Sequence, residues 1–146
     1  LYEEHYEILK KYKDAKRIYD SKLEKKALLI IQTQPGAVDT TKENVNGGKI
    51  EDKFERFVSE LEKLDPELQT ARNERDLQEY FLKKKELELK NSMDILDKIY
   101  YYKYIQKLRV KHIAPKINYS REQTYRYLTK LEEKIKMLKM TQNDTN

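Results

Sequence analysis

Apolar side chains recur at spacings of three and four residues along the N-terminal part of the chain. This spacing marks one face of an α-helix and predicts an amphipathic helix over residues 1–34. The turn-forming stretch that follows, PGAVDTTKENVNGG, predicts a linker over residues 35–49. The apolar face consists of Leu1, His5, Ile8, Tyr12, Ala15 and Tyr19, continued by Leu23, Ala27 and Ile30.

The segment after the linker is predicted to be a helical pair or arm over residues 50–91. Its first helix ends where Asp65-Pro66 indicates a restart, because aspartate favours the N-cap and proline the first helical position. A break is expected at Asn91-Ser92, with Ser92 capping a new helix from Met93 to Gln106. Such charged helices bury little surface alone, so we expect a homo-oligomer that forms through the N-terminal helices.

The C-terminal segment contains two shorter helical patterns separated by a turn. Asn118 tolerates the left-handed conformation that ends a helix, and Ser120 with Gln123 fits the capping box S-x-x-Q. The apolar face of the first helix is Val110, Ile113, Ala114 and Ile117, and the expected core stripe of the second is Tyr125, Leu128, Leu131, Ile135 and Leu138.

These patterns predict an all-α fold with two parts. Long N-terminal amphipathic helices, as a helical hairpin or coiled coil, precede a helix-turn-helix DNA-binding domain over residues 92–139. The recognition helix is expected over residues 120–138, and residues 140–146 form a tail.

Charge and composition narrow the function. The net charge is +5, and residues 99–139 carry eleven basic but only three acidic residues. This distribution is typical of a protein surface that contacts nucleic acid, or of a lysine-rich face exposed to solvent. Without cysteine, with two histidines and with no long apolar run, the chain is expected to lack metal sites, cofactors and membrane spans, and to be cytoplasmic.

The string YIQKLRVKHIAPKINYSREQTYRYLTKLEEKI resembles the helix-turn-helix of sigma-factor region 4. With the hinge pattern D-x-x-K-x-x-x-N-G-G, the chain is similar to phage-encoded transcriptional regulators of Gram-positive bacteria of the RinA and ArpU type. The resemblance implies control of a phage or prophage operon in a bacterial host cell, and contact with host RNA polymerase. Three residues depart from the pattern of these helix-turn-helix proteins. Pro115 is expected to kink or shorten the first helix of the motif. Lys107 and Arg109 stand before that helix, at positions where a glycine and a small capping residue are common.

Groove geometry assigns roles to the exposed face of the second helix. We expect Arg121 to contact a guanine edge or a phosphate, Glu122 a cytosine amino group, and Gln123 an adenine. Gln123 has the alternative role of closing the capping box. The phosphate-binding candidates are Lys111, Lys116, Tyr119, Ser120, Thr124, Arg126 and Lys130.

Two other classes of function are compatible with the same sequence features. One is a helical adaptor or structural phage protein in which the basic charge serves solubility, and the other is a small packaging subunit. No arrangement of residues indicates a catalytic site, so the protein is expected not to be an enzyme. The tyrosines at 100, 101, 102 and 104 could stack unpaired bases, but wrapping a helical core is their more common role.

Overall fold

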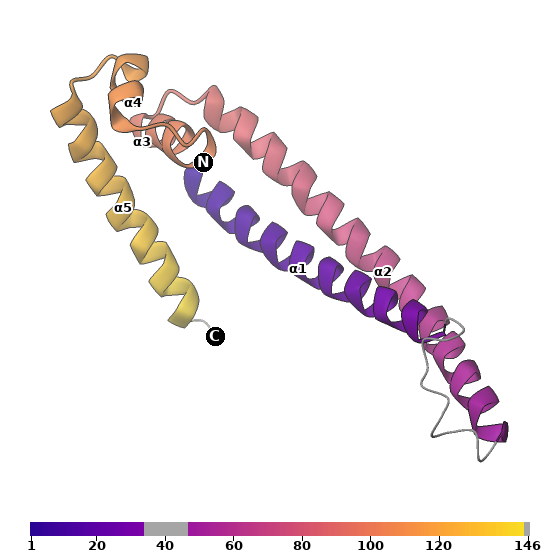
Figure 1. The fold of residues 1–146 in the computed structure, drawn as a ribbon. Helices are drawn as coiled ribbons and strands as arrows, with labels where there is room; N and C mark the ends of the chain where they lie inside the picture. The colour runs from indigo at the N-terminus through magenta and orange to yellow at the C-terminus, as the bar shows by residue number, and fades with distance from the viewer. Residues whose placement is uncertain (34–46, 145–146) are drawn as a thin grey trace. The chain divides into compact units, whose positions relative to one another are not determined.

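A computed structural model describes residues 1–33 and 47–144, and every regular element in these ranges is a helix (Figure 1). The prediction of an all-α fold is therefore confirmed. The elements are α1 (Tyr2–Thr33), α2 (Gly47–Lys90), α3 (Ile95–Tyr100), the π-helix η1 (Tyr101–Ile105), α4 (Val110–Ile117) and α5 (Arg121–Asp144).

The chain divides into two compact units, and the long helices α1 and α2 contribute to both. Unit 1 comprises Leu1–Lys10 and Glu79–Asn146, and unit 2 comprises Lys11–Gln78. The first ten residues are thus packed with the C-terminal helices, at the opposite end of the sequence. Each unit has its own cluster of buried apolar side chains.

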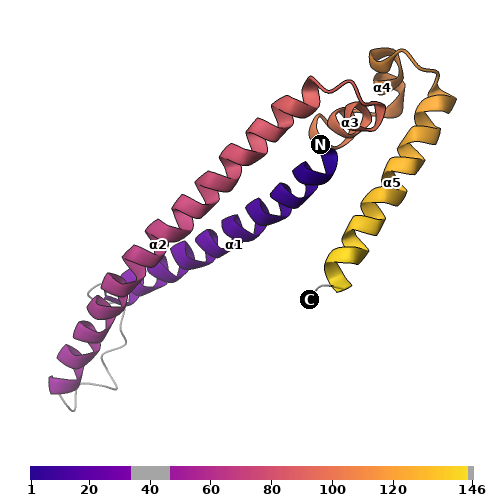
Figure 2. The same cartoon turned by 180° about the vertical axis from the view of Figure 1, so that it is seen from behind.

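Unit 2 is a pair of antiparallel helices formed by parts of α1 and α2, which run side by side in both views (Figures 1 and 2). Two ion pairs between the helices set their register: Lys22 with Glu67 at 3.1 Å and Lys26 with Asp65 at 2.8 Å. The buried side chains are few. Leu29, Leu64 and Leu68 form the core, and Tyr19, Phe57 and Leu61 pack against it.

The apolar face of α1 in unit 2 is narrower than the sequence pattern predicted. Leu29 is buried, whereas Leu23 and Ile30 of the predicted stripe are 45% and 40% exposed. The physical reason is that a helix with one neighbouring helix buries only a seam with a spacing of about 3.5 residues. Lys22 and Lys26 occupy two positions along this seam and form ion pairs with α2.

Helix α2 continues through Pro66, so the predicted restart at Asp65 is wrong. A proline inside a helix removes one backbone hydrogen bond and costs about 3 kcal/mol. Burial on both sides of the proline offsets this cost, because Leu64 and Leu68 both belong to the core around Leu29. Thr70 also donates its hydroxyl to the Pro66 carbonyl at 3.0 Å.

The start of α2 corrects the predicted linker. The helix begins at Gly47, so residues 47–49 are helical rather than part of a linker over 35–49. The rest of that predicted linker, residues 35–46, lies outside the described residues.

Unit 1 is built around a larger core, to which α1, α2 and all of the shorter helices contribute. Its most deeply buried apolar side chains include Leu89, Ile99, Ile113 and Leu131. In the first turn of α1, Tyr2 is buried, whereas Leu1 of the predicted stripe is 43% exposed.

The predicted break after α2 is confirmed, but the predicted cap is wrong. Helix α3 begins at Ile95, and its N-cap is Asp94, whose side chain accepts the backbone N–H of Asp97 at 3.2 Å. Ser92 instead accepts the N–H of Asp94 and donates its hydroxyl to the Asp97 carboxylate at 2.8 Å. Ser92 therefore fixes the loop before the helix rather than the helix itself.

The tyrosine-rich segment wraps the core, as the structural interpretation of these residues predicted. Tyr100 is 2% exposed, and Tyr101 and Tyr102 are half-buried against the same cluster. The helix widens here into the π-helix η1, in which the Gln106 N–H bonds to the Tyr101 carbonyl at 3.0 Å. Tyr104 remains 38% exposed.

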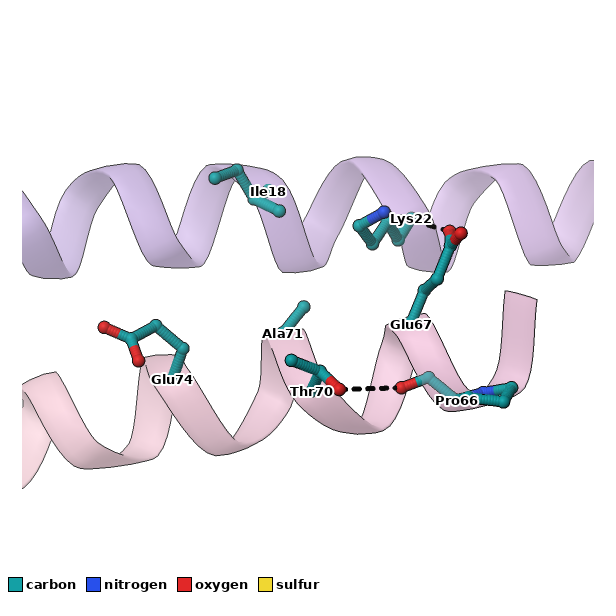
Figure 3. Close-up of a pocket in the computed structure, with 7 residues that line it drawn as sticks. All are labelled: Ile18, Lys22, Pro66, Glu67, Thr70, Ala71 and Glu74. Atoms are coloured by element: carbon teal, nitrogen blue, oxygen red, sulfur yellow. Dashed lines mark hydrogen bonds and ion pairs between the residues drawn. The ribbon is translucent and has the colours of Figure 1, made fainter. Parts of the chain in front are cut away.

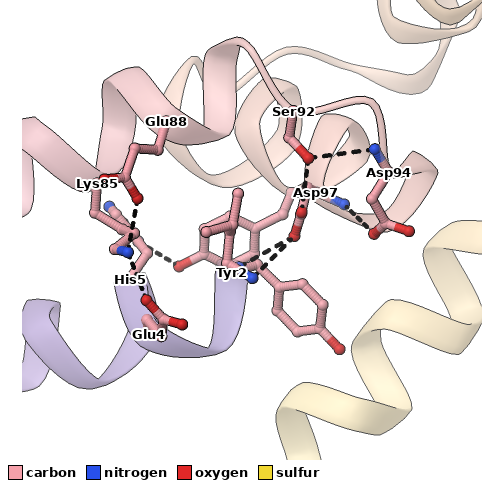
Figure 4. Close-up of polar contacts among 10 residues, drawn as sticks. Tyr2, Glu4, His5, Lys85, Glu88, Ser92, Asp94 and Asp97 are labelled. Atoms are coloured by element: carbon pink, nitrogen blue, oxygen red, sulfur yellow. Dashed lines mark hydrogen bonds and ion pairs between the residues drawn. The ribbon is translucent and has the colours of Figure 1, made fainter.

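A buried polar cluster joins the first turns of α1 to α2 and α3 (Figure 4). Nδ1 of His5 and the Tyr100 hydroxyl form a 2.7 Å hydrogen bond, and Nε2 of His5 lies 3.5 Å from the Glu86 carboxylate. The Asp97 carboxylate accepts the backbone N–H of Tyr2 at 3.1 Å. Burial lowers the pKa of His5 below its ordinary value, although Glu86 opposes this shift.

We expect unit 1 to lose stability as the pH falls below about 6.5, the ordinary pKa of histidine in an unfolded chain. Because the pKa of His5 is lowered in the fold, the unfolded state takes up the proton more readily. The loss can reach about 1.4 kcal/mol per pH unit until the pH passes the pKa of the folded state. Urea unfolding between pH 7.5 and 5 measures it.

Replacement of each histidine in turn provides the control for this prediction. His5→Asn should flatten the dependence of the free energy of unfolding on pH in that range. His112 is exposed, so His112→Asn should leave the dependence as it is in the wild type. Equal behaviour of the two variants would contradict the assignment to His5.

Candidate nucleic-acid interface

Helix α4 is short and packs one face into the core of unit 1. Its predicted apolar face is confirmed, since Val110, Ile113, Ala114 and Ile117 are all buried. Pro115 lies inside this eight-residue helix, as expected from its position in the sequence. Burial of Ala114 before the proline and of Ile117 after it holds the last turn in place.

The start of α4 adopts a backbone geometry that its own residues do not favour. Lys107 has a φ of 57°, in the left-handed region that favours glycine. Arg109 occupies the N-cap position, and its side chain makes no capping hydrogen bond. The segment therefore adopts the backbone of a glycine and a small capping residue without having either.

The turn between α4 and α5 is closed by backbone hydrogen bonds. Asn118 adopts the predicted left-handed conformation, with a φ of 60°, and its N–H donates to Pro115 at 3.4 Å. The N–H of Tyr119 donates to the Ala114 carbonyl at 3.1 Å. Such bonds terminate a helix and fix the direction in which the chain leaves it.

The predicted capping box at the start of α5 is confirmed. The Ser120 hydroxyl accepts the N–H of Gln123 at 3.2 Å, and the side-chain oxygen of Gln123 accepts the N–H of Ser120 at 3.2 Å. A bidentate contact with adenine needs both the oxygen and the nitrogen of a glutamine side chain. With the box closed, the Gln123 oxygen faces the Ser120 backbone, and the side-chain nitrogen is the atom left for a ligand.

The core face of α5 differs from the predicted stripe at one position. Leu128, Leu131 and Ile135 are buried as expected, but Tyr125 is 57% exposed. Thr124 takes its place, with 0% exposure, and donates its hydroxyl to the Ser120 carbonyl at 2.8 Å. A threonine fits here because this hydrogen bond satisfies its polar atom inside the core. Thr124 is therefore unavailable as a phosphate ligand.

The remaining residues predicted for DNA contact are on the surface of unit 1. Arg121 and Arg126 form no ion pair with any other described residue, and Glu122 likewise has no cationic partner within those ranges. Their charges are thus directed at solvent. The exposed members of the predicted set are Lys111, Lys116, Tyr119, Ser120, Arg121, Glu122, Gln123, Arg126 and Lys130.

Two of the predicted phosphate-binding lysines lie over aromatic rings. The Lys116 ammonium lies 5.7 Å from the centre of the Tyr102 ring, and the Lys130 ammonium lies 5.5 Å from that of Tyr127. Tyr127 also stacks on Tyr119 of the turn, with ring centres 5.6 Å apart and planes at 18°. The sequence prediction did not pair Tyr102 or Tyr127 with a lysine. The spacing of three residues between Tyr127 and Lys130 was the signal for one of these pairs.

A second surface feature, in unit 2, carries no comparable charge pattern. A hollow of about 580 Å³ lies over the small side chain of Ala71, beside Ile18 and Pro66 (Figure 3). The Lys22–Glu67 ion pair crosses its edge, so the cation there is already neutralised. Nothing in this arrangement favours a charged ligand.

The described residues contain neither a candidate metal site nor a candidate membrane-spanning helix. No three histidine, aspartate or glutamate side chains in residues 1–33 and 47–144 gather closely enough to hold a metal ion. Among the helices that the structure describes, none combines the length and the apolar character needed to cross a bilayer.

No family model, curated protein or solved structure matches the chain. The functional argument therefore depends on the geometry and charge of unit 1.

Proposed function

We propose that the protein is a non-enzymatic, sequence-specific DNA-binding protein. In this proposal α4, the turn at Asn118–Ser120 and α5 act as a helix-turn-helix, and the first turns of α5 enter the major groove of double-stranded DNA. Residues of α4 and of the turn contact the backbone phosphates on either side of this groove.

A single observation carries this proposal. The first turns of α5 expose a row of polar and cationic side chains, while the opposite face of the same helix is fixed in a core by Leu128 and Leu131. A groove-binding helix needs this combination, because the side chains that read bases must be directed by a rigid support. Arg121 and Arg126 have no competing carboxylate among the described residues.

The capping box refines the expected base contacts. Arg121 is suited to the two acceptors of a guanine edge, and Glu122 to the amino group of a cytosine. Gln123 is suited to a base or phosphate acceptor through its side-chain nitrogen, since its oxygen closes the cap. The phosphate contacts fall to Lys111, Lys116, Tyr119, Ser120, Arg126 and Lys130, which are all exposed.

The resemblance to phage-encoded regulators extends the proposal from binding to regulation. A protein of this kind controls transcription of a phage or prophage operon, and host RNA polymerase is a second partner. Both statements depend on the sequence pattern around the α4–α5 segment.

Salt dependence of duplex binding tests the proposal. DNA fragments enriched from a random pool by the purified full chain provide the cognate duplex. With six or so phosphate contacts, the affinity should fall about a thousandfold or more between 50 and 200 mM salt. A flat response, or equally weak binding of all duplexes, would contradict the proposal and favour an adaptor or structural role.

We also propose that the protein forms a homo-oligomer through unit 2. Two helices alone bury little apolar surface, and the core cluster of unit 2 contains three buried leucines among its described residues. A second helical pair packed against the first would form a four-helix bundle and cover exposed apolar side chains on one side of the pair. Leu23 and Ile31 of α1, which are 45% and 54% exposed, are assigned to that side.

Light scattering with a charged substitution tests the oligomer. The wild type should have at least twice the mass of one chain at micromolar concentration. The double change Leu23→Glu with Ile31→Glu should give the mass of one chain, because it places charges in the proposed interface. Lys25→Glu, at an exposed polar position of α1, is the control and should keep the wild-type mass. A wild type that is already monomeric would rule the interface out.

A further inference from the structure

The outer face of α5 contains a hollow that extends over the first three turns of the helix. It has a volume of about 490 Å³ and is formed by side chains of this one helix: Gln123, Arg126, Tyr127, Thr129 and Lys130. Two of the five are cations, and none is a carboxylate. An arrangement of two cations around a concave surface favours an anion, and a phosphodiester most of all.

The donors in this hollow can be identified one by one. Thr129 donates its hydroxyl to the Tyr125 carbonyl at 2.9 Å, so its proton is occupied. The Gln123 oxygen is held by the cap, which leaves its side-chain nitrogen. The Arg126 guanidinium and the Lys130 ammonium are therefore the charged donors that remain for phosphate oxygens, and the Tyr127 hydroxyl is a neutral donor beside them. The Gln123 nitrogen is assigned to the base contact proposed above.

Tyr127 fixes the position of one of these donors. Its ring is half-buried against the core of unit 1 and stacks on Tyr119, so it is restrained from two sides. The Lys130 ammonium lies 5.5 Å from the centre of this ring. A lysine held in this way loses less conformational entropy when it binds a ligand than a free lysine would.

We infer that this hollow binds one backbone phosphodiester of double-stranded DNA, and that Tyr127 is the positioning residue for Lys130. The inference depends on the proposed function and makes it more specific. Arg126 and Lys130 are four positions apart, so their side chains lie on the same face of α5, one turn apart. DNA contact therefore continues along this face past the first turn of α5.

Affinity measured at several salt concentrations tests the inference with the full chain. The cognate duplex and a duplex of unrelated sequence are the two ligands. Arg126→Gln combined with Lys130→Gln should lower the slope of log affinity against log salt by about 1.8 for both duplexes, or about 0.9 for each lost contact. The preference for the cognate duplex should persist, because phosphate contacts do not read sequence.

Substitutions of Tyr127 separate positioning from direct contact. Tyr127→Leu removes the ring and should lower both affinity and slope, whereas Tyr127→Phe keeps the ring and should match the wild type. The exposed Tyr125 on the same helix is the matched control, and Tyr125→Leu should also match the wild type. Circular dichroism establishes that each variant retains its helices. Arg126→Gln and Lys130→Gln change exposed side chains only, so they test the hollow without altering the core.

The outcomes distinguish this inference from the proposed function. If the wild type binds no duplex, the proposed function fails and the hollow fails with it. If the wild type binds with sequence preference but the glutamine variant keeps the full slope, only the hollow is refuted. Loss of slope with retained preference supports both, and equal effects of Tyr127→Leu and Tyr127→Phe would refute the positioning role.

Discussion

Leu131→Ala is expected to destabilise unit 1 by about 2–5 kcal/mol. Leu131 has 0% exposure and lies in the core shared by α4, α5 and the first turn of α1. Truncation removes buried apolar surface and leaves a cavity that the surrounding helices can fill only in part. Because a typical domain is stable by about 5–15 kcal/mol, this single change is a large fraction of the total.

Urea unfolding followed by circular dichroism measures this effect. Met137→Ala is the matched control, since Met137 lies on the same helix and is 67% exposed. A surface change of this kind should alter the free energy of unfolding by no more than about 0.5 kcal/mol. Similar losses for the two variants would show that α5 is not anchored through the face that contains Leu131.

The combined change Arg121→Ala and Gln123→Ala is expected to abolish the preference for the cognate duplex. A bidentate contact between arginine and guanine discriminates by about 1–3 kcal/mol, and the glutamine adds a smaller contribution through its nitrogen. Together they predict a loss of about tenfold to several hundredfold in preference. Competition binding between cognate and unrelated duplexes gives this ratio directly.

Two further variants make this result interpretable. Gln123→Glu keeps an oxygen that can close the capping box but removes the side-chain donor, so it separates helix capping from recognition. Lys136→Ala removes an exposed cation from a later turn of α5 and should leave the preference unchanged. An unchanged preference in the double variant, with wild-type helical content, would contradict the assigned base contacts.

Local features of the C-terminal segment could be predicted from the sequence. The capping box of Ser120 and Gln123 and the left-handed Asn118 depend on residues within one turn of each other, and the structure shows both. The apolar face of α4 was predictable for the same reason. The exposure of the residues around Arg121 follows from the core face of α5, where Leu128, Leu131 and Ile135 are buried as predicted.

Other features depend on hydroxyl groups or on contacts between distant segments, and the apolar pattern did not predict them. The exchange of Tyr125 for Thr124 on the core face depends on a hydroxyl that bonds back to Ser120, which the apolar pattern does not reveal. The continuity of α2 through Pro66 depends on Leu29 of another helix. Nor does the sequence indicate that Tyr2 bonds to Asp97, since these residues are separated by 95 positions.

The central claim is that the first turns of α5 occupy the major groove. Methylation of guanine N7 modifies the major-groove edge alone, so interference by this modification tests the claim most directly. We expect N7 methylation of one or more guanines in the cognate duplex to abolish binding of the wild type, and the Arg121→Ala variant to be insensitive at that guanine. Binding that tolerates methylation at every guanine, but is displaced by a minor-groove ligand, would contradict the account.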